Sequence, residues 1–295
     1  MVQYYLALVI LRLSAWLPLP VLHGIGYLIG LLLTAIPNRL HSTTAHNLRR
    51  CFPSLTEIDR RRLVRCCLIE TARTLVETGA LWLRPGDRAL ALIRSVDRRE
   101  LIDEALQQGR GVILATPHLG SWEAAGLYGG AQFRMTCLYR PLRMAKLEQL
   151  VREARSRLGA RYVTTSAAGI RAMYRTLEQG GTVALLPDQE PQAGSGVFAP
   201  FFGIPAWSTV LLARMARRTG AQVVFAWCER LPGGRGYDLH FRPAPADIDN
   251  ADLAVAVGAM NRAVEELVRE CPEQYQWGYR RFRRRPEGEV PFYPE

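Results

Sequence analysis

The chain has 295 residues, of which 48% are hydrophobic and 22% charged, which is typical of a folded protein and excludes a wholly disordered one. Its formal net charge is +11, and nearly all of the positive charge comes from Arg, so acidic proteins, anionic lipid surfaces and nucleic acids are candidate partners. The six cysteines follow no CxxC pattern or regular spacing, which argues against a zinc site or a disulfide framework. They are predicted to be reduced, mostly buried thiols of a cytoplasmic domain.

The N-terminus, residues 1–37, is predicted to be an apolar helical membrane anchor, because its only full charge is Arg12. Residues 13–36 are long enough for one tilted span, since a spanning helix needs roughly 20 apolar residues. Pro18 and Pro20 interrupt that stretch, so two short helices lying in or dipping into the bilayer fit equally well. A helical hairpin buried in the protein core is the alternative.

The rest of the chain, residues 38–295, is predicted to be one domain. Residues 38–110 have a helical pattern with Arg-rich faces and no strand-like alternation, and they form a helical lead-in. These Arg side chains are either solvated or in contact with lipid headgroups. From residue 111 to residue 295 short apolar runs alternate with helical patterns, which indicates an α/β core of strands joined by crossover helices.

The elements of this core can be placed from the same patterns. The predicted strands are residues 111–116, 135–139, 161–165, 182–187, 222–228 and 237–241. The predicted helices lie near residues 121–129, 144–158, 167–179, 207–219 and 250–271.

A candidate reactive group follows the first strand of the core. His118 comes just beyond strand 111–116, and open α/β sheets bind ligands beyond the carboxyl ends of their strands. Gly120 lets the chain turn, so Glu123 can meet His118 over the strand end, and Ser121 is expected to cap the helix that follows. A carboxylate bonded to one imidazole nitrogen leaves the other as a general base. On spacing alone, a structural histidine is the alternative.

The segment HLGSWE that contains this pair resembles the His-x4-acid motif of the glycerolipid and lysophospholipid acyltransferase superfamily. The wider chain resembles the lipid A late acyltransferases, the lauroyl and myristoyl transferases of that superfamily. The segments that carry the resemblance are, in order, the apolar N-terminus, YRPLR (139–143), GGTVALLPDQ (180–189), VFAPFFGIPA (197–206) and PEQYQWGYRRFRRRPEG (272–288). This resemblance implies a glycerolipid-acyltransferase-like α/β fold, with a mixed central sheet flanked by helices.

The resemblance also implies roles for four residues. His118 would deprotonate an acceptor hydroxyl, and Glu123 would orient the histidine. Arg140 matches the family's Arg after its second strand and would bind an anionic group of donor or acceptor, with a structural ion pair as the alternative. Asp188 occupies the family's acidic position and would orient Arg140 or hold a polar acceptor group, with a loop cap as the alternative. The loop after Asp188, QEPQAGSG, departs from the best-known members.

Two further segments leave alternatives open. The run FAPFFGIP (198–205) is aromatic and apolar, so it either lines an acyl channel or fills the core. The tail RRFRRR (280–285) is either a solvated face or a contact for lipid phosphates.

The function that follows is transfer of a fatty acyl chain from an acyl carrier protein thioester to a hydroxyl of a lipid A precursor. Acidic carrier proteins suit a chain of net charge +11. The partners are then the carrier protein, a lipid acceptor and the inner membrane, with the catalytic domain on its cytoplasmic side, and neither a cofactor nor a metal is required. An acyltransferase acting on a lysophospholipid, ornithine lipid or glycolipid is the alternative.

Two other classes of protein fit the sequence less well. A hydrolase is disfavoured because the chain has no GxSxG elbow and no HExxH zinc motif. A nucleic-acid-binding protein is suggested by the Arg excess alone and has no need of an apolar N-terminus. No nucleic acid is therefore expected among the partners.

Overall fold

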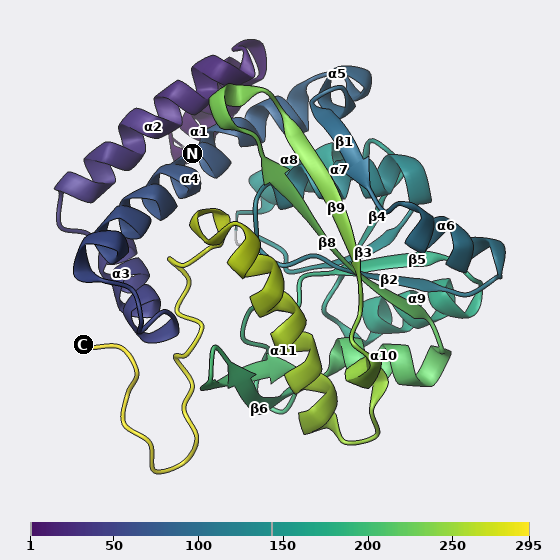
Figure 1. The fold of residues 1–295 in the computed structure, drawn as a ribbon. Coiled ribbons are helices and arrows are strands. Elements are labelled where there is room, and N and C mark those ends of the chain that lie inside the picture. The colour runs from purple at the N-terminus through teal and green to yellow at the C-terminus, as the bar shows by residue number, and fades with distance from the viewer. Residues whose placement is uncertain (1, 143, 295) are drawn as a thin grey trace.

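The computed structural model describes residues 2–142 and 144–294, and the side chains of these residues except at positions 2–4, 6 and 7. Arg143, the last residue of the YRPLR segment, lies outside the described residues. The fold is a mixed α/β sheet flanked by helices, with a helical layer at the N-terminal end of the chain (Figure 1). The fold class predicted from the sequence is confirmed in this respect.

The N-terminal layer contains five helices whose first two are separated at the predicted break. They are α1 (Val2–Trp16), α2 (Leu19–Ala35), α3 (Arg39–Cys51), α4 (Glu57–Leu83) and α5 (Gly86–Leu90). Pro18 precedes α2 and Pro20 lies in its first turn, where a proline is tolerated because the missing N–H has no helical partner anyway. Two short helices therefore form instead of one long one.

The length and composition of these helices bear on the predicted membrane anchor. Among the described residues, no one helix is both long and apolar enough to cross a membrane. The pair α2 and α3 reaches the required length and composition together, but the two helices meet at 81°. The membrane anchor predicted from the sequence accordingly stays a prediction.

Helix α2 packs closely on α4 through two glycines. A β-carbon on Gly26 would lie 2.8 Å from the Cα of Arg73, and one on Gly30 would lie 2.4 Å from the Cα of Ile69. The outer side of the layer, in contrast, is apolar and exposed. Its large exposed side chains are Tyr5, Val9, Ile10, Leu13, Trp16, Val21, Ile25, Tyr27, Leu28, Leu32 and Ile36. In the described part of the chain, these outer side chains of α1 and α2 are thus largely accessible to solvent.

The central sheet has seven strands in the order β1-β9-β8-β2-β5-β3-β4. Their bounds are β1 Ile93–Asp97, β2 Val112–Ala115, β3 Thr136–Tyr139, β4 Arg161–Thr164, β5 Thr182–Leu185, β8 Gln222–Arg230 and β9 Tyr237–Pro243. Strands β8 and β9 are antiparallel, and all other neighbours are parallel. All six strands predicted for the core are confirmed.

Strand β1 corrects the prediction for residues 38–110, which was entirely helical. This five-residue strand, IRSVD, is at the edge of the sheet, where only β9 pairs with it. Because an edge strand is largely solvated, its sequence carries little of the apolar alternation that marks an inner strand. The short helix α6 (Glu100–Gln107) then leads into β2.

Helices cover both faces of the sheet. The bounds of the crossover helices are α7 Trp122–Phe133, α8 Ala145–Ser156, α9 Ala167–Glu178, α10 Leu211–Thr219 and α11 Leu253–Glu270. Alternate residues of β2 point to opposite faces: Ile113 packs in the core beneath α9, α10 and α11, and Leu114 packs in the core beneath α6 and α7. All four residues of β2 are buried, as a central parallel strand requires.

The FAPFFGIP segment forms a hairpin of β6 (Gly196–Phe201) and β7 (Ile204–Thr209). Phe202 and Gly203 at its tip have φ of 50° and 73°, the left-handed backbone that a two-residue hairpin turn favours. Phe201 is buried and contacts the ring of Phe282, so the core-filling alternative is correct. The helix predicted from residue 207 begins at Leu211, because β7 continues to Thr209.

Candidate active site

The register of the sheet places a histidine next to an aspartate. Ala115 at the end of β2 pairs with Leu185 at the end of β5. His118 and Asp188 each lie three residues beyond these partners. Because the two strands are parallel, both side chains emerge at the same edge of the sheet.

The two side chains form a tight pair. The Nδ1 of His118 lies 2.8 Å from Oδ1 of Asp188, and the backbone N–H of His118 donates to Oδ2 at 2.9 Å. Asp188 is 3% exposed, and burial opposes its ionisation. The charge and hydrogen bonds of His118 outweigh that effect and lower the pKa of Asp188 below its ordinary value. Asp188 is thus a carboxylate, which only accepts, so the Nδ1 of His118 is the donor.

The other ring nitrogen of His118 faces a glutamine. The side-chain amide nitrogen of Gln189 lies 3.2 Å from Nε2 of His118 and donates to Oε1 of Gln276 at 2.9 Å. With the proton on Nδ1, the Nε2 of a neutral imidazole is an acceptor and matches an amide N–H. The pairing holds His118 in the tautomer that a general base requires.

The turn between β2 and α7 depends on a glycine. Gly120 has φ of 61°, and a β-carbon there would lie 2.0 Å from the carbonyl oxygen of Cys228. Its N–H donates to the carbonyl oxygen of Gln274, and the N–H of Gln276 donates to that of His118. The segment after α11 therefore lies across the turn and holds it against β8. We name residues 118–121 the catalytic turn.

Glu123 does not contact His118, although the sequence predicted that contact. It lies in the first turn of α7, where its carboxylate accepts from Nε1 of Trp82 at 2.8 Å and from Nε of Arg155 at 3.0 Å, with a second ion-pair contact to Arg155. Burial opposes the charge of Arg155, but the Glu123 carboxylate raises the pKa of this guanidinium. The spacing between His118 and Glu123 correctly placed Glu123 near the strand end. It could not show that Arg155, distant in the sequence, forms an ion pair with the Glu123 carboxylate.

Ser121 differs from expectation as well. It occupies the N-cap position of α7, but its side chain makes no capping hydrogen bond. Instead its hydroxyl donates to Glu77 of α4 at 2.8 Å. The partner of Ser121 is 44 residues away in the sequence, so a local capping pattern could not reveal it.

Arg140 directly follows β3, which neighbours β5 in the sheet. Its side chain is exposed, and it lines the same cavity as His118. Asp188 is paired with His118 rather than with Arg140. Arg140 therefore lies at the cavity apart from the His118–Asp188 pair, and its binding of an anionic group stays a prediction.

A cavity of about 530 Å³ opens at His118, within the size range of small-molecule sites. Its polar part includes His118, Arg140, Gln189, Gln192 and Arg214. Its apolar part runs along α7 and the sheet, with Leu114, Gly126, Phe133, Met135 and Phe241 among the lining residues. Glu123 and Arg155 also line it. One cavity thus joins a basic nitrogen to an apolar space.

The arginines of the C-terminal tail are mostly engaged within the fold. Arg281 is 3% exposed and donates to the carbonyl oxygen of Trp207 and to Ser208. Arg285 donates to the carbonyl oxygen of Pro205, and Arg284 lies over the Trp207 ring. Arg283 is the exposed member of the group, with 72% of its side chain accessible. The tail therefore fastens the β6–β7 hairpin, and neither the solvated face nor the lipid contact describes it as a whole.

Within residues 2–142 and 144–294, no three His, Cys, Asp or Glu side chains come together as a metal site. The six cysteines are all free thiols, five of them buried, as predicted.

Comparison with known proteins decides the family. Residues 1–284 match the model of the bacterial lipid A biosynthesis acyltransferases. The chain belongs to this family. It is 31% identical over 285 residues to the lipid A biosynthesis lauroyltransferase of Escherichia coli K12, an alignment that covers 96% of this chain and 92% of the relative. The palmitoleoyltransferase of the same organism is 29% identical over the same shares of both chains.

Another relative is named for a different acceptor. The phosphatidylinositol mannoside acyltransferase of Mycobacterium tuberculosis is 30% identical over 179 residues, covering 57% of this chain and 55% of the relative. Membership of the family makes this chain an acyltransferase, and the resemblance inferred from its motifs is confirmed.

Several residues of the site were missed from the sequence. Gln189 and Gln276 lie within segments that carried the resemblance, but amides give no motif of their own. Trp82 and Arg155 come from helices α4 and α8, and only the folded chain brings them to Glu123.

Proposed function

We propose that this acyltransferase transfers a fatty acyl chain from an acyl carrier protein thioester to a hydroxyl of a lipid A precursor, with His118 as the general base. The family supports acyl transfer to lipid A. The observation that carries the mechanism is the geometry of His118, which donates through Nδ1 to buried Asp188 and lines the cavity, where Nε2 faces the amide of Gln189.

The chemistry follows from that geometry. Nε2 of His118 takes the proton of the acceptor hydroxyl while the hydroxyl oxygen attacks the thioester carbonyl carbon. The tetrahedral intermediate then expels the carrier thiolate, which receives the proton from the imidazolium, so an ester forms as the thioester breaks. Asp188 holds the imidazole and stabilises its charged form, the orienting role that the sequence had given to Glu123. Glu123, with Arg155, instead supports the wall of the cavity.

The remaining parts of the cavity fit the two substrates. Its apolar part along α7 would hold the acyl chain, since burial of each methylene is worth about 0.8 kcal/mol. Arg140 would bind an anionic group of donor or acceptor at the polar part, where Gln189 would give way to the acceptor hydroxyl. An acidic carrier protein suits the net charge of +11.

The exposed apolar side of α1 and α2 supports a membrane location. Trp16 is 88% exposed and Leu28 is 66% exposed, and many exposed apolar side chains on neighbouring helices are typical of a lipid or protein contact. We place the protein at the cytoplasmic side of the inner membrane, with residues 1–37 as the anchor of the domain formed by residues 38–295.

Activity of purified protein tests the mechanism. With an acyl carrier protein thioester and a lipid A precursor, His118→Ala is expected to abolish transfer while the circular dichroism spectrum stays unchanged. Exposed Arg88→Ala, on α5, serves as the control and should transfer at the wild-type rate. Near wild-type transfer by His118→Ala would exclude the general base.

A second acceptor class is favoured by one comparison. The partial match to the phosphatidylinositol mannoside acyltransferase shows that this sequence pattern also occurs in an enzyme named for another glycolipid. Mass spectrometry of lipid A from cells with and without the protein distinguishes the two acceptors. Loss of one secondary acyl chain supports lipid A, whereas unchanged lipid A with an altered glycolipid supports the second class.

A further inference from the structure

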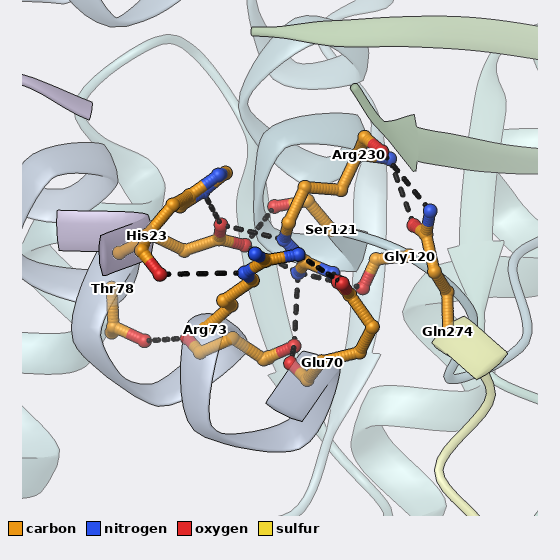
Figure 2. A network of polar contacts seen from close by, with 10 residues as sticks. His23, Glu70, Arg73, Thr78, Gly120, Ser121, Arg230 and Gln274 are labelled. Atoms are coloured by element: carbon orange, nitrogen blue, oxygen red, sulfur yellow. Dashed lines mark hydrogen bonds and ion pairs between the residues drawn. The ribbon is translucent and has the colours of Figure 1, made fainter. Parts of the chain in front are cut away.

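A buried network of charged side chains lies behind the catalytic turn (Figure 2). Glu77 of α4 and Arg230 at the end of β8 form its centre, and each has only 1% of its side chain exposed. Arg230 donates to both carboxylate oxygens of Glu77, at 2.7 and 2.8 Å, and to Glu70 at 2.9 Å. Burial opposes the charge on Glu77, but Arg230 and His23 lower its pKa to about 2.

The network reaches the catalytic turn through two contacts. Ser121, 1% exposed, donates its hydroxyl proton to Oε1 of Glu77 at 2.8 Å. The guanidinium of Arg230 also approaches the carbonyl oxygen of Gly120 at 3.4 Å. Glu77 belongs to α4 and Arg230 to β8, whereas the backbone hydrogen bonds of the turn involve Cys228 of β8 and residues 274–276. The turn is therefore held by side-chain contacts of the network as well as by backbone hydrogen bonds.

The same network extends to two other parts of the chain. His23 of α2 lies 3.0 Å from Glu77 through its Nε2, and its carbonyl oxygen accepts from Arg73. Gln274 exchanges two hydrogen bonds with the backbone of Arg230, at 2.8 and 3.0 Å. Figure 2 shows these side chains converging from α2, α4, β8 and the segment after α11.

Buried ion pairs are weak contributors to stability, because removing two charges from water offsets most of their attraction. Apolar side chains of the same volume would serve a purely structural role as well. A buried network does fix geometry, since each partner accepts only one arrangement of donors. Here the network contacts Gly120 and Ser121, which lie two and three residues after His118.

We propose that Glu77, Arg230 and Ser121 are positioning residues that hold the catalytic turn so that Nε2 of His118 faces the acceptor hydroxyl. None of the three touches the reacting atoms. They act on the rate of the chemical step and not on substrate affinity. This inference rests on the proposed function only in its kinetic part, because the position of the turn is a property of the protein alone.

The Ser121→Ala variant tests the proposal with the smallest change, since Glu77 keeps Arg230 and His23. We expect kcat to fall about tenfold, the loss of one charge-assisted hydrogen bond, with KM for the thioester changed by less than about twofold. Glu77→Gln should lower kcat further. The matched control is Thr78→Ala, because the Thr78 hydroxyl donates only within α4, to the carbonyl oxygen of Thr74.

A merely structural role predicts another result. In that case Ser121→Ala and Thr78→Ala would lose equal kcat per folded molecule when each is assayed equally far below its own melting temperature. Equal kcat values for Ser121→Ala and the wild type, or a loss confined to KM, would overturn the proposal. If Glu77→Gln does not fold, the Ser121→Ala comparison still decides it.

Hydrogen exchange separates this proposal from the proposed function. Amides of residues 118–122 should exchange about tenfold faster in Ser121→Ala than in the wild type and unchanged in Thr78→Ala. Unchanged exchange in Ser121→Ala overturns the positioning role, whatever the activity. If the wild type transfers no acyl group but Ser121→Ala still exchanges faster than the wild type, only the proposed function is contradicted.

Discussion

His118 shows how far a single motif can be interpreted. Its position just beyond a strand follows from the sequence, and the end of a parallel strand is a recurrent ligand site. Its partner does not follow. Glu123 is nearer in the sequence, but Asp188 is brought closer by the pairing of β2 with β5. That pairing is a property of strand order, which local patterns do not specify.

The two acids can be told apart by substitution. Asp188→Asn should lower kcat by about 10²- to 10⁴-fold with little change in KM, since it removes the group that fixes the tautomer of His118. Glu123→Gln should lower kcat less and also lower the melting temperature, because it leaves Arg155 without its carboxylate. Steady-state kinetics and thermal unfolding measure both effects. A greater kcat loss in Glu123→Gln would return the orienting role to Glu123.

At the scale of elements, the core strands were predictable because buried parallel strands are short, continuous apolar runs. Strand β1 and the β6–β7 hairpin were not. The former is polar and pairs only with β9, and the latter has aromatic and proline residues whose strand character depends on the core that receives them. In both cases tertiary packing decides the local structure.

Helix α7 gives a prediction of this kind. Gly126 lines the cavity, and a β-carbon there would meet only the hydroxyl of Tyr162, at 3.5 Å. Gly126→Leu should therefore fill part of the apolar space and shift the preference toward shorter acyl donors. Competition between carrier thioesters of different chain length measures the shift, and Ala131→Leu on the same helix is the control. An unchanged preference would show that the acyl chain lies elsewhere.

At the scale of the whole molecule, the exposed apolar side of α1 and α2 is separated from the interior by a tight α2–α4 contact. The apolar composition of residues 1–37 was evident in the sequence. Which of those side chains face outward was not, because it depends on the side of each helix that α4 covers.

Vesicle flotation tests that surface. Introducing charge with Leu13→Glu and Leu28→Glu, at residues 60% and 66% exposed, should release the protein from vesicles of mixed neutral and anionic lipids. Val290→Glu, at a residue 80% exposed in the C-terminal segment, is the matched control and should leave flotation unchanged. Flotation of the double variant at the wild-type level would exclude α1 and α2 as the lipid contact.

The segment after α11 matters for how the protein folds during its own synthesis on the ribosome. The catalytic turn receives backbone hydrogen bonds from Gln274 and Gln276, which the ribosome adds about 150 residues after His118 itself. A nascent chain that has already folded β2, β5 and α7 therefore still lacks two backbone hydrogen bonds of its catalytic turn. We expect a chain that terminates before residue 274 to hold His118 less firmly than the full chain does.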